Sequence, residues 1–303
     1  MPWGIRVIDP AAILAHPVLE VRYRYDARDV MLHALATGLG TDPMDTDQLR
    51  FAYEELKPPL LVLPTFAIVL GWVDLVRDPR SRNPRLGLDG ARVVVGQAGL
   101  KLYKPMAQSG SGCSRSYFAE VVDKGPGRGA LVCARREVYD DGGDLVAVVD
   151  TWLFARGGGG FGGASIGGLP RQPLPARPPD AIVQTETPAH LALLYRLSLG
   201  DHNPVHADPA HALATGFDRP ILHGLASLSI GLHGAIRGIT GSLASHGSRL
   251  RAAYATQARP VFPGDCLRTQ AWAEGTDIRF QTTVVARSEV VVDAGWLRLD
   301  PPG

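Results

Sequence analysis

A short run near the middle of the chain, Gly200-Asp-His-Asn-Pro-Val-His206, carries the side chains best suited to chemistry. Asp201, Asn203 and His206 place an acid, an amide and an imidazole within six positions, and Pro204 stiffens the turn between them. A carboxylate and an imidazole, with a pKa of about 6.5, can exchange protons with one water molecule. Because the sequence contains no metal-binding or nucleotide-binding motif, we expect this loop to perform acid–base chemistry with its own side chains.

A second feature, His223-Gly224, follows Pro220 and stands where a long apolar segment begins. The first amides of a helix have no partner within the helix and carry partial positive charge. Gly224 lacks a Cβ, so a ligand oxygen can approach its N–H closely. We expect this N–H to donate to a thioester carbonyl oxygen and to stabilise enolate-like charge on it.

With an acyl thioester held in this way, its Cα and Cβ would lie near Asp201 and His206. One of these residues would take a proton from water while the other delivers a proton to Cα. The residue types leave open which does which. Asn203 can donate and accept at once, so it is suited to orienting the substrate or the acid.

A helix start immediately after the loop would hold it in place. Asp208 is typical of a helix N-cap, Pro209 of the first helical position and Gly216 of a helix end. This pattern predicts a short helix over 210–215, with the loop over 201–206 leading into it.

The larger elements that must position these residues follow one plan twice. Apolar patterns predict helices over 29–38 and 58–71 in the first half and over 220–237 in the second. Runs rich in β-branched and aromatic residues predict strands over 91–103, 115–122, 130–139, 145–154, 250–259, 266–273, 278–286 and 290–299. This is an α+β pattern, and a sheet wrapped around one apolar helix is called a hot-dog fold. Two such units side by side could form one continuous sheet.

Two internal matches at similar offsets indicate a duplicated unit. Residues 259–265 resemble 104–110, 155 positions earlier, and Pro220-Ile-Leu resembles Pro59-Leu-Leu, 161 positions earlier. A glycine run and a proline-rich run over 157–179 predict a linker, or else a long ordered loop packed over one half. We expect an N-terminal unit over 1–160, a linker over 161–180 and a C-terminal unit over 181–303.

The composition is that of a globular protein with more than one domain. The 303 residues are 45% hydrophobic and carry a net charge of +1, which gives no general attraction to nucleic acid or to a membrane. The longest apolar stretch, 60–72, is interrupted by Pro64 and is too short to cross a bilayer. No signal peptide is evident, and three cysteines without metal-like spacing fit a reduced cytoplasm.

The Asp201–His206 loop resembles the signature of the (R)-specific enoyl-CoA hydratases, also called hydratase 2 or MaoC-like dehydratases. The resemblance covers most of the chain, through the segments 62–71, 122–130, 158–163, 200–209, 219–225 and 260–265. It implies a double hot-dog whose C-terminal half hydrates a trans-2-enoyl-CoA to the (3R)-3-hydroxyacyl-CoA and whose N-terminal half houses the acyl chain. It also implies a homodimer without a cofactor, acting on a CoA or acyl-carrier-protein thioester.

By the same resemblance, Asp201 and His206 are the catalytic pair, with the roles of acid and base left open, Asn203 supports them and Gly224 is the oxyanion donor. The first half has Val62-Leu63 in place of the His-Gly pair and contains no acid–Asn–His loop. Four departures from the family pattern bear on acyl and CoA specificity: Leu199 between Ser198 and Gly200, His33 in place of a common aromatic, the strand end Ala255-Thr-Gln-Ala-Arg259, and the turn lengthened by Ser109-Gly-Ser-Gly112.

Other polar residues have competing interpretations. His202, His206 and His211 have no common zinc spacing, so we expect no metal. We interpret His223 as a helix-start residue with a structural hydrogen bond, against the alternative of a second base, and it is also a candidate for substrate contact. The basic residues Arg77, Arg80, Arg82, Arg85, Lys101 and Lys104 face solvent or contact CoA phosphates, and Arg82 and Lys104 are the candidates for substrate contact.

Two other functions stay open beside hydration. An acyl-CoA thioesterase would direct water at the carbonyl carbon instead of Cβ and release free thiol. A non-catalytic subunit would bind an acyl thioester without turnover, and the intact acid–Asn–His loop argues against it.

Overall fold

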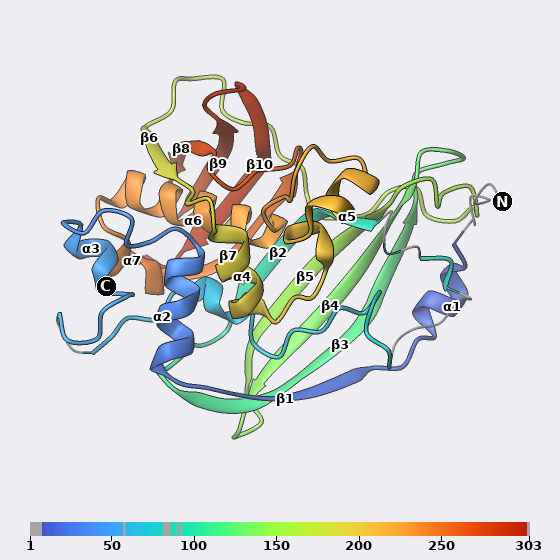
Figure 1. Cartoon of the computed structure of the whole chain (residues 1–303), viewed down its shortest axis with the longest axis horizontal. Coiled ribbons are helices and arrows are strands. Elements are labelled where there is room, and N and C mark those ends of the chain that lie inside the picture. The colour runs from blue at the N-terminus through green and yellow to red at the C-terminus, as the bar shows by residue number, and fades with distance from the viewer. Residues whose placement is uncertain (1–7, 57–58, 81–85, 89, 91–92, 302–303) are drawn as a thin grey trace.

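The computed structural model of the chain, described here for residues 8–56, 59–80, 86–88, 90 and 93–301, contains one antiparallel sheet (Figure 1). Its ten strands run in the order β1-β3-β4-β5-β2-β7-β10-β9-β8-β6. The strands are β1 (Leu19–Tyr25), β2 (Val93–Leu102), β3 (Gly110–Asp123), β4 (Ala130–Asp140), β5 (Leu145–Ala155), β6 (Ala181–Glu186), β7 (Leu250–Gln257), β8 (Cys266–Glu274), β9 (Asp277–Val284) and β10 (Glu289–Leu299). The predicted strands are confirmed, whereas β1 and β6 were not predicted.

The two halves of the chain have the same strand order. Read from its outer edge inward, the first half runs β1-β3-β4-β5-β2 and the second runs β6-β8-β9-β10-β7. The inner strands pair from Gln97 opposite Thr256 to Lys101 opposite Ala252, so the halves share one sheet. This confirms the predicted α+β double hot-dog and its continuous sheet. The unit boundaries at 160 and 180 stay a prediction.

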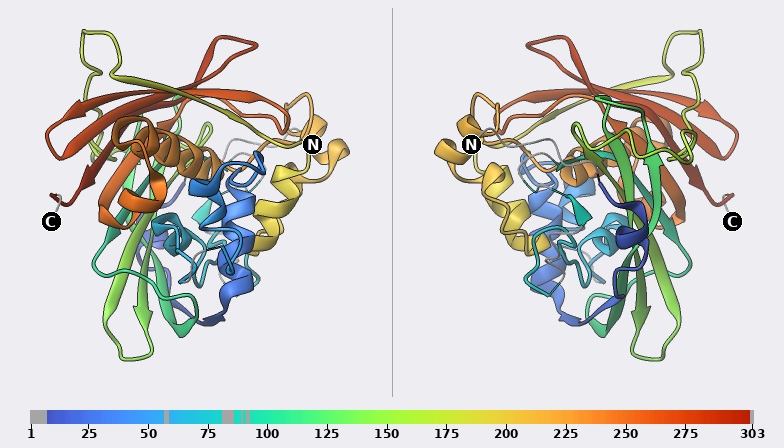
Figure 2. Two further views of the ribbon diagram at one scale, coloured as in Figure 1. Left: turned by 90° about the vertical axis from the view of Figure 1, so that its left-hand side faces the viewer. Right: turned by 90° about the vertical axis from the view of Figure 1, so that its right-hand side faces the viewer.

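Helix α6 (Gly224–Thr240) is the apolar helix that the second half wraps (Figure 2). Glycines let it approach the sheet: a Cβ on Gly231 would stand 2.9 Å from the Thr282 hydroxyl. The helix ends at Gly241, whose φ of 81° is left-handed. It begins four residues later than predicted, because residues 220–223 are extended and Leu222 N–H donates to the Val261 carbonyl instead.

The predicted helix over 58–71 is wrong. In its place is a five-residue 3-10 helix, η1 (Pro64–Ile68), buried against the sheet. Pro64 cannot continue a helix from its N-terminal side, and Gly71 ends the segment with a φ of 57°. The carbonyls left free at the end of so short a helix need other partners, and Ile68 C=O accepts a hydrogen bond from Arg136.

Helices α2 (Ala27–Ala36) and α4 (Leu191–Leu199) pack against each other on the inner side of the bent sheet (Figures 1 and 2). The predicted helix over 29–38 is confirmed as α2, which Asp26 caps, whereas α4 was not predicted. Short helices complete the structure: α1 (Pro10–Leu14), α3 (Thr46–Leu49), η3 (Pro204–His206), α5 (Pro209–Ala214), α7 (Leu243–His246) and η4 (Gly247–Arg249).

The segment between β5 and β6 contacts both halves: its glycine run packs on the first half, whereas in its proline-rich run the Arg177 carbonyl accepts a 2.8 Å hydrogen bond from Trp272 of the second half. The Asp123 carboxylate accepts hydrogen bonds from the amides of Gly125, Gly160 and Gly162 at 2.7–2.8 Å. The glycines therefore form an ordered loop around one carboxylate, and the whole segment contacts both halves instead of the one half that the alternative predicted. Among the described residues, no helix has the length and apolar character needed to cross a membrane.

Candidate active site

The acid–Asn–His loop lies between α4 and α5. Gly200 ends α4 with a left-handed φ of 77°, and η3 and α5 follow at once, with Asp208 capping α5. The predicted helix over 210–215 is therefore confirmed. The loop carries Asp201 and His206 inward, where both are buried, while His202 faces solvent.

His206 is held as a neutral base. Its Nδ1 lies 2.8 Å from the Ile221 carbonyl, which can only accept, so the proton is on Nδ1 and the lone pair is on Nε2. Burial lowers the pKa of His206 to about 4, so the imidazole is neutral at pH 7. Its Nε2 lies 3.8 Å from Oδ2 of Asp201. That separation is too long for a hydrogen bond and suits two groups that contact the same small molecule.

Asp201 is the acidic member of the pair, and its burial favours the protonated form. Burial raises the pKa of its carboxyl above the usual value, and a 2.8 Å hydrogen bond from the Asn203 N–H to Oδ1 offsets part of that rise. Asn203 thus orients the acid through its backbone amide. Its side-chain oxygen accepts a 3.3 Å hydrogen bond from Val205 N–H and caps η3.

His223 completes a compact group of three side chains. It is the N-cap of α6, and its ring stacks on that of His206 with centroids 3.6 Å apart. Its Nε2 lies 3.5 Å from Asp201 Oδ2, but neither ring nitrogen makes a hydrogen bond. The helix-start prediction is confirmed, and the predicted structural hydrogen bond is wrong because neither ring nitrogen has a partner among the described residues. Burial holds the pKa of His223 well below its usual value, so this ring is also neutral.

Gly224 is the first residue of α6 and lines the same cavity. A Cβ at this position would stand 3.3 Å from Cγ of Gln257 and 3.4 Å from Cβ of Val95. The absence of that atom leaves the Gly224 N–H open to a ligand. Gln257, at the end of β7, lies beside it, and its buried Nε2 has no hydrogen-bond partner. The sequence marks Gln257 only as part of the strand end 255–259, which departs from the family pattern. Its side chain becomes a candidate donor because β7 places it next to the start of α6.

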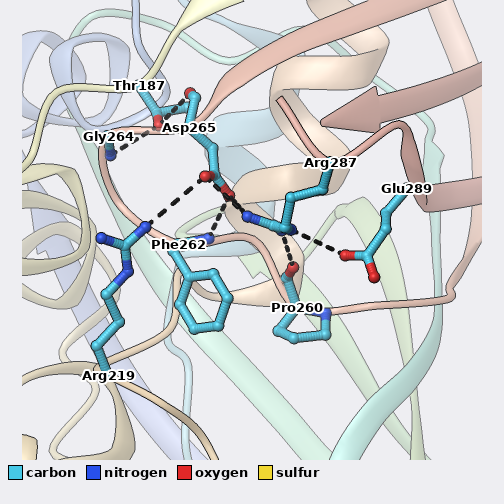
Figure 3. A network of polar contacts seen from close by, with 8 residues as sticks. All are labelled: Thr187, Arg219, Pro260, Phe262, Gly264, Asp265, Arg287 and Glu289. Atoms are coloured by element: carbon cyan, nitrogen blue, oxygen red, sulfur yellow. Dashed lines mark hydrogen bonds and ion pairs between the residues drawn. The ribbon is translucent and has the colours of Figure 1, made fainter. Parts of the chain in front are cut away.

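A network of polar contacts holds the turn after β7, as Figure 3 shows, and Pro260 and Val261 of this turn line the cavity. Asp265, which is 7% exposed, accepts from Arg287 at 2.9 Å and from Phe262 N–H at 2.8 Å. The Phe262 ring lies between the guanidinium groups of Arg219 and Arg287, at 4.9 and 5.1 Å. Because Leu222 N–H donates to Val261 C=O at 2.7 Å, this turn is tied to the start of α6.

The site opens into a cavity of about 230 Å³. The second half contributes Asp201, Asn203, His206, His223, Gly224 and Gln257. The first half contributes a wall from the inner face of its sheet, including Val95, Ser116, Arg136 and Leu153. Both halves are therefore needed to enclose one ligand site.

The remaining candidates lie elsewhere. Lys104 is not at this cavity: its ammonium lies between the carboxylates of Asp140 and Asp144, 2.9 Å from the latter. Arg82 lies outside the described residues, whereas Arg77 of the same basic stretch lines the cavity and pairs with Asp74 at 2.9 Å.

Of the three histidines whose spacing matches no common zinc site, His202 is exposed and His206 is buried. A different set converges: single donor atoms of Asp201, His206 and His223 lie within 4.8 Å of one another and could hold a divalent ion. The same lone pair of His206 would then be occupied by the metal, so metal binding and acid–base chemistry exclude each other here.

Fold and site together define an acid–base enzyme built on a double hot-dog, and comparisons with known proteins agree. Residues 170–294 match the MaoC like domain and residues 23–157 match the MFE-2 hydratase 2 N-terminal domain. Over 298 residues the chain is 34% identical to a protein named peroxisomal enoyl-CoA hydratase 2 of Arabidopsis thaliana, covering 94% of this chain and 93% of that one. It is also 34% identical to the peroxisomal multifunctional enzyme type 2 of Mus musculus, covering 95% of this chain and 38% of that protein.

The structural comparison gives the same family. A MaoC-like dehydratase from Phytophthora capsici superposes with a TM-score of 0.81 at 27% identity, covering 97% of this chain and 99% of that one. The chain belongs to the enoyl-CoA hydratase 2 family of MaoC-like hydro-lyases.

Proposed function

We propose that this protein adds water to a trans-2-enoyl-CoA and forms the (3R)-3-hydroxyacyl-CoA, and that it catalyses the reverse dehydration. The observation that carries the proposal is the pair formed by the neutral His206 Nε2 and the Asp201 carboxyl, 3.8 Å apart, beside the exposed amide of Gly224. The R configuration rests on the family resemblance.

In the forward reaction His206 acts as the base. Its Nε2 accepts a proton from water while the water oxygen forms a bond to Cβ. The electrons of the Cα–Cβ double bond move toward the thioester, and negative charge gathers on the carbonyl oxygen. The Gly224 N–H donates to that oxygen, at the positive end of α6.

Asp201 completes the addition as the acid. Its carboxyl proton passes to Cα, which restores the thioester carbonyl and leaves a carboxylate. The proton that His206 took from water then returns to Asp201 across the gap between them. The net change is one water added across one double bond, and both side chains return to their starting state.

The first half has a supporting role in this proposal. Leu63 is the N-cap residue of η1 as His223 is of α6, so Leu63-Pro64 stand where the second half has His223-Gly224, one residue later than the predicted pair Val62-Leu63. The inner face of the first half has no acid–imidazole pair at the cavity among the described residues. We infer that it holds the acyl group, and that the enzyme works as a homodimer in the cytoplasm, which gel filtration with light scattering and cell fractionation would test.

A turnover screen tests the proposal. Purified protein is given trans-2-enoyl-CoAs of graded length, and loss of the conjugated thioester absorbance is followed together with free thiol. We expect absorbance loss without thiol, and a product that only a (3R)-specific dehydrogenase oxidises. Thiol release from a saturated acyl-CoA would instead identify a thioesterase, and binding without turnover at any length would identify a non-catalytic subunit.

A further inference from the structure

A buried arginine stands on the wall of the cavity that the first half provides. Arg136, on β4, is 5% exposed, and Ser116, on β3, is 3% exposed. The two residues are direct cross-strand partners, so their side chains share the inner face of the sheet. Both line the cavity that contains Asp201 and His206.

The Arg136 guanidinium has no carboxylate partner among the described residues. One of its terminal nitrogens donates to the Ile68 carbonyl, but its Nε has no hydrogen-bond partner, and neither does the Ser116 hydroxyl. By contrast Arg135, the next residue along β4, forms a 2.7 Å ion pair with Asp150. Arginine is almost never fully buried without a partner, because an unpaired buried charge is costly.

The hydrogen bond from Arg136 to the end of η1 accounts for only part of the hydrogen-bonding capacity of this guanidinium. A guanidinium has five N–H donors in a planar fork, and the Ile68 carbonyl uses one of them. The Nε–H of Arg136 and the Ser116 hydroxyl have no partner in the part of the chain that the structure describes, so we infer that a ligand supplies their acceptor. Burial lowers the pKa of Arg136 to about 10, so the group is still a cation at neutral pH.

Because Arg136 lies on the wall that the first half provides, we expect it to contact the acyl group of a ligand and not the CoA portion. A thioester oxygen at Gly224 places Cα and Cβ at Asp201 and His206, and the acyl chain then continues toward the first half. Arg136 lines the same cavity as Asp201 and His206, and a cavity of about 230 Å³ suits a short acyl group.

We propose that the acyl group of the preferred substrate ends in a carboxylate, so that the substrate is a monothioester of a short unsaturated dicarboxylic acid. Arg136 receives the carboxylate through its fork of N–H donors, and Ser116 adds one hydrogen bond. The identity of the thioester rests on the proposed function, whereas the recognition of the carboxylate rests on Arg136 and Ser116.

A binding measurement tests this inference independently of turnover. Saturated dicarboxylyl-CoAs (succinyl-, glutaryl- and adipyl-CoA) are compared by calorimetry with butyryl-, valeryl- and hexanoyl-CoA of the same chain lengths. At one length or more, we expect the carboxylated ligand to bind at least about tenfold more tightly, because only that ligand gives the buried guanidinium a charged partner. Equal or weaker binding of the carboxylated ligand at every length would overturn the inference.

Kinetics on the matched trans-2-enoyl substrates then separates the two proposals. Turnover of unsubstituted enoyl-CoAs with no preference for the carboxylated ones contradicts the inference alone. Absence of turnover on every substrate contradicts the proposed function alone, and the calorimetry still decides the inference.

The variant Arg136→Met assigns the effect to this side chain. We expect the ratio of kcat/KM for carboxylated over unsubstituted substrate to fall by about 30-fold or more. Arg115→Met, on the outer face of the neighbouring strand, is the matched control and should keep the ratio. If Arg136→Met does not fold, Ser116→Ala gives the second readout, with a smaller fall in the same ratio, and an unchanged ratio in Ser116→Ala and in any folded Arg136 variant would overturn the inference.

Discussion

The Nε2 of His206 faces Oδ2 of Asp201 across 3.8 Å, and the backbone holds each of them from behind. The Ile221 carbonyl fixes the proton on the far side of the imidazole, and the Asn203 amide fixes the far oxygen of the carboxyl. The atoms that face each other are therefore the ones left free for chemistry. Burial acts on the two groups in opposite ways, since it keeps His206 neutral and favours the protonated form of Asp201.

This arrangement predicts the pH dependence of kcat/KM. His206 must be neutral, so activity should fall only as the pH drops toward about 4, the pKa to which burial lowers it. Asp201 must carry a proton, so activity should fall as the pH rises past its raised pKa. The pair titrates jointly, so the two limbs report on both groups together. A pH profile measured at low substrate checks this, and an acid limb near pH 6.5, the ordinary histidine value, would contradict it.

A second group of buried histidines predicts acid sensitivity of the fold. His33 and His233 both lie within 3.1 Å of the Thr65 hydroxyl, and together they link α2, η1 and α6. Burial lowers the pKa of each to about 3, whereas the unfolded chain binds the proton near pH 6.5. Each folded-state pKa is depressed, so stability is complete above pH 6.5 and is lost as the pH falls from there toward 3.

Between pH 6.5 and 3, each of these two histidines should lower the free energy of unfolding by about 1.4 kcal/mol for every unit by which the pH falls. Urea unfolding at a series of pH values measures the slope. His33→Phe removes one of the two groups and should make the slope shallower by about that amount, provided that the variant folds. An identical slope in the variant would show that His33 titrates normally.

Gln257 offers a prediction about the oxyanion. Its unpaired amide lies beside Gly224 and would be a second donor to the thioester carbonyl. Gln257→Met keeps the size of the side chain and removes the donor, so kcat should fall by about 100-fold with little change in KM. Gln184→Met, at an exposed position on β6, is the control. A normal kcat in Gln257→Met would contradict a role for Gln257 as a second donor and would leave the Gly224 N–H as the donor to the thioester carbonyl.

The convergence of Asp201, His206 and His223 predicts inhibition by zinc. An ion bound there would take the lone pair of His206 and the carboxylate of Asp201, so added Zn²⁺ should abolish activity and EDTA should restore it. Enzyme treated with EDTA alone should be fully active. Loss of activity on EDTA treatment, with recovery on addition of a metal, would contradict the acid–base mechanism.

The sequence could predict the catalytic loop because its geometry is local. Asp201, Asn203 and His206 lie within one loop, and Pro204 and the cap at Asp208 constrain it, so little depends on distant residues. The apolar α6 was predictable for the same reason. Strands β1 and β6 were missed although β1 alternates half-buried and exposed residues, and both lie at the edges of the sheet.

Other features depend on pairing across the sheet and could not be predicted. An apolar run alone does not separate a buried helix from the short η1, whose carbonyl is satisfied by Arg136 from a distant strand. Arg136 and Ser116 meet because of the β3–β4 register, and Gln257 reaches Gly224 because β7 ends beside α6. These contacts join residues far apart in the chain, so local pattern carries no signal for them.

The most direct test of the account measures turnover of a trans-2-enoyl-CoA by Asp201→Asn and His206→Gln enzymes, with His202→Gln, exposed in the same loop, as the control. Circular dichroism and thermal unfolding would establish that all three fold. We predict that each of the first two variants loses about 10²–10⁴-fold in kcat, because each lacks one of the two proton-transfer groups, while the control keeps its activity. Folded Asp201→Asn and His206→Gln enzymes that both hydrate the substrate at the normal rate would contradict the central claim.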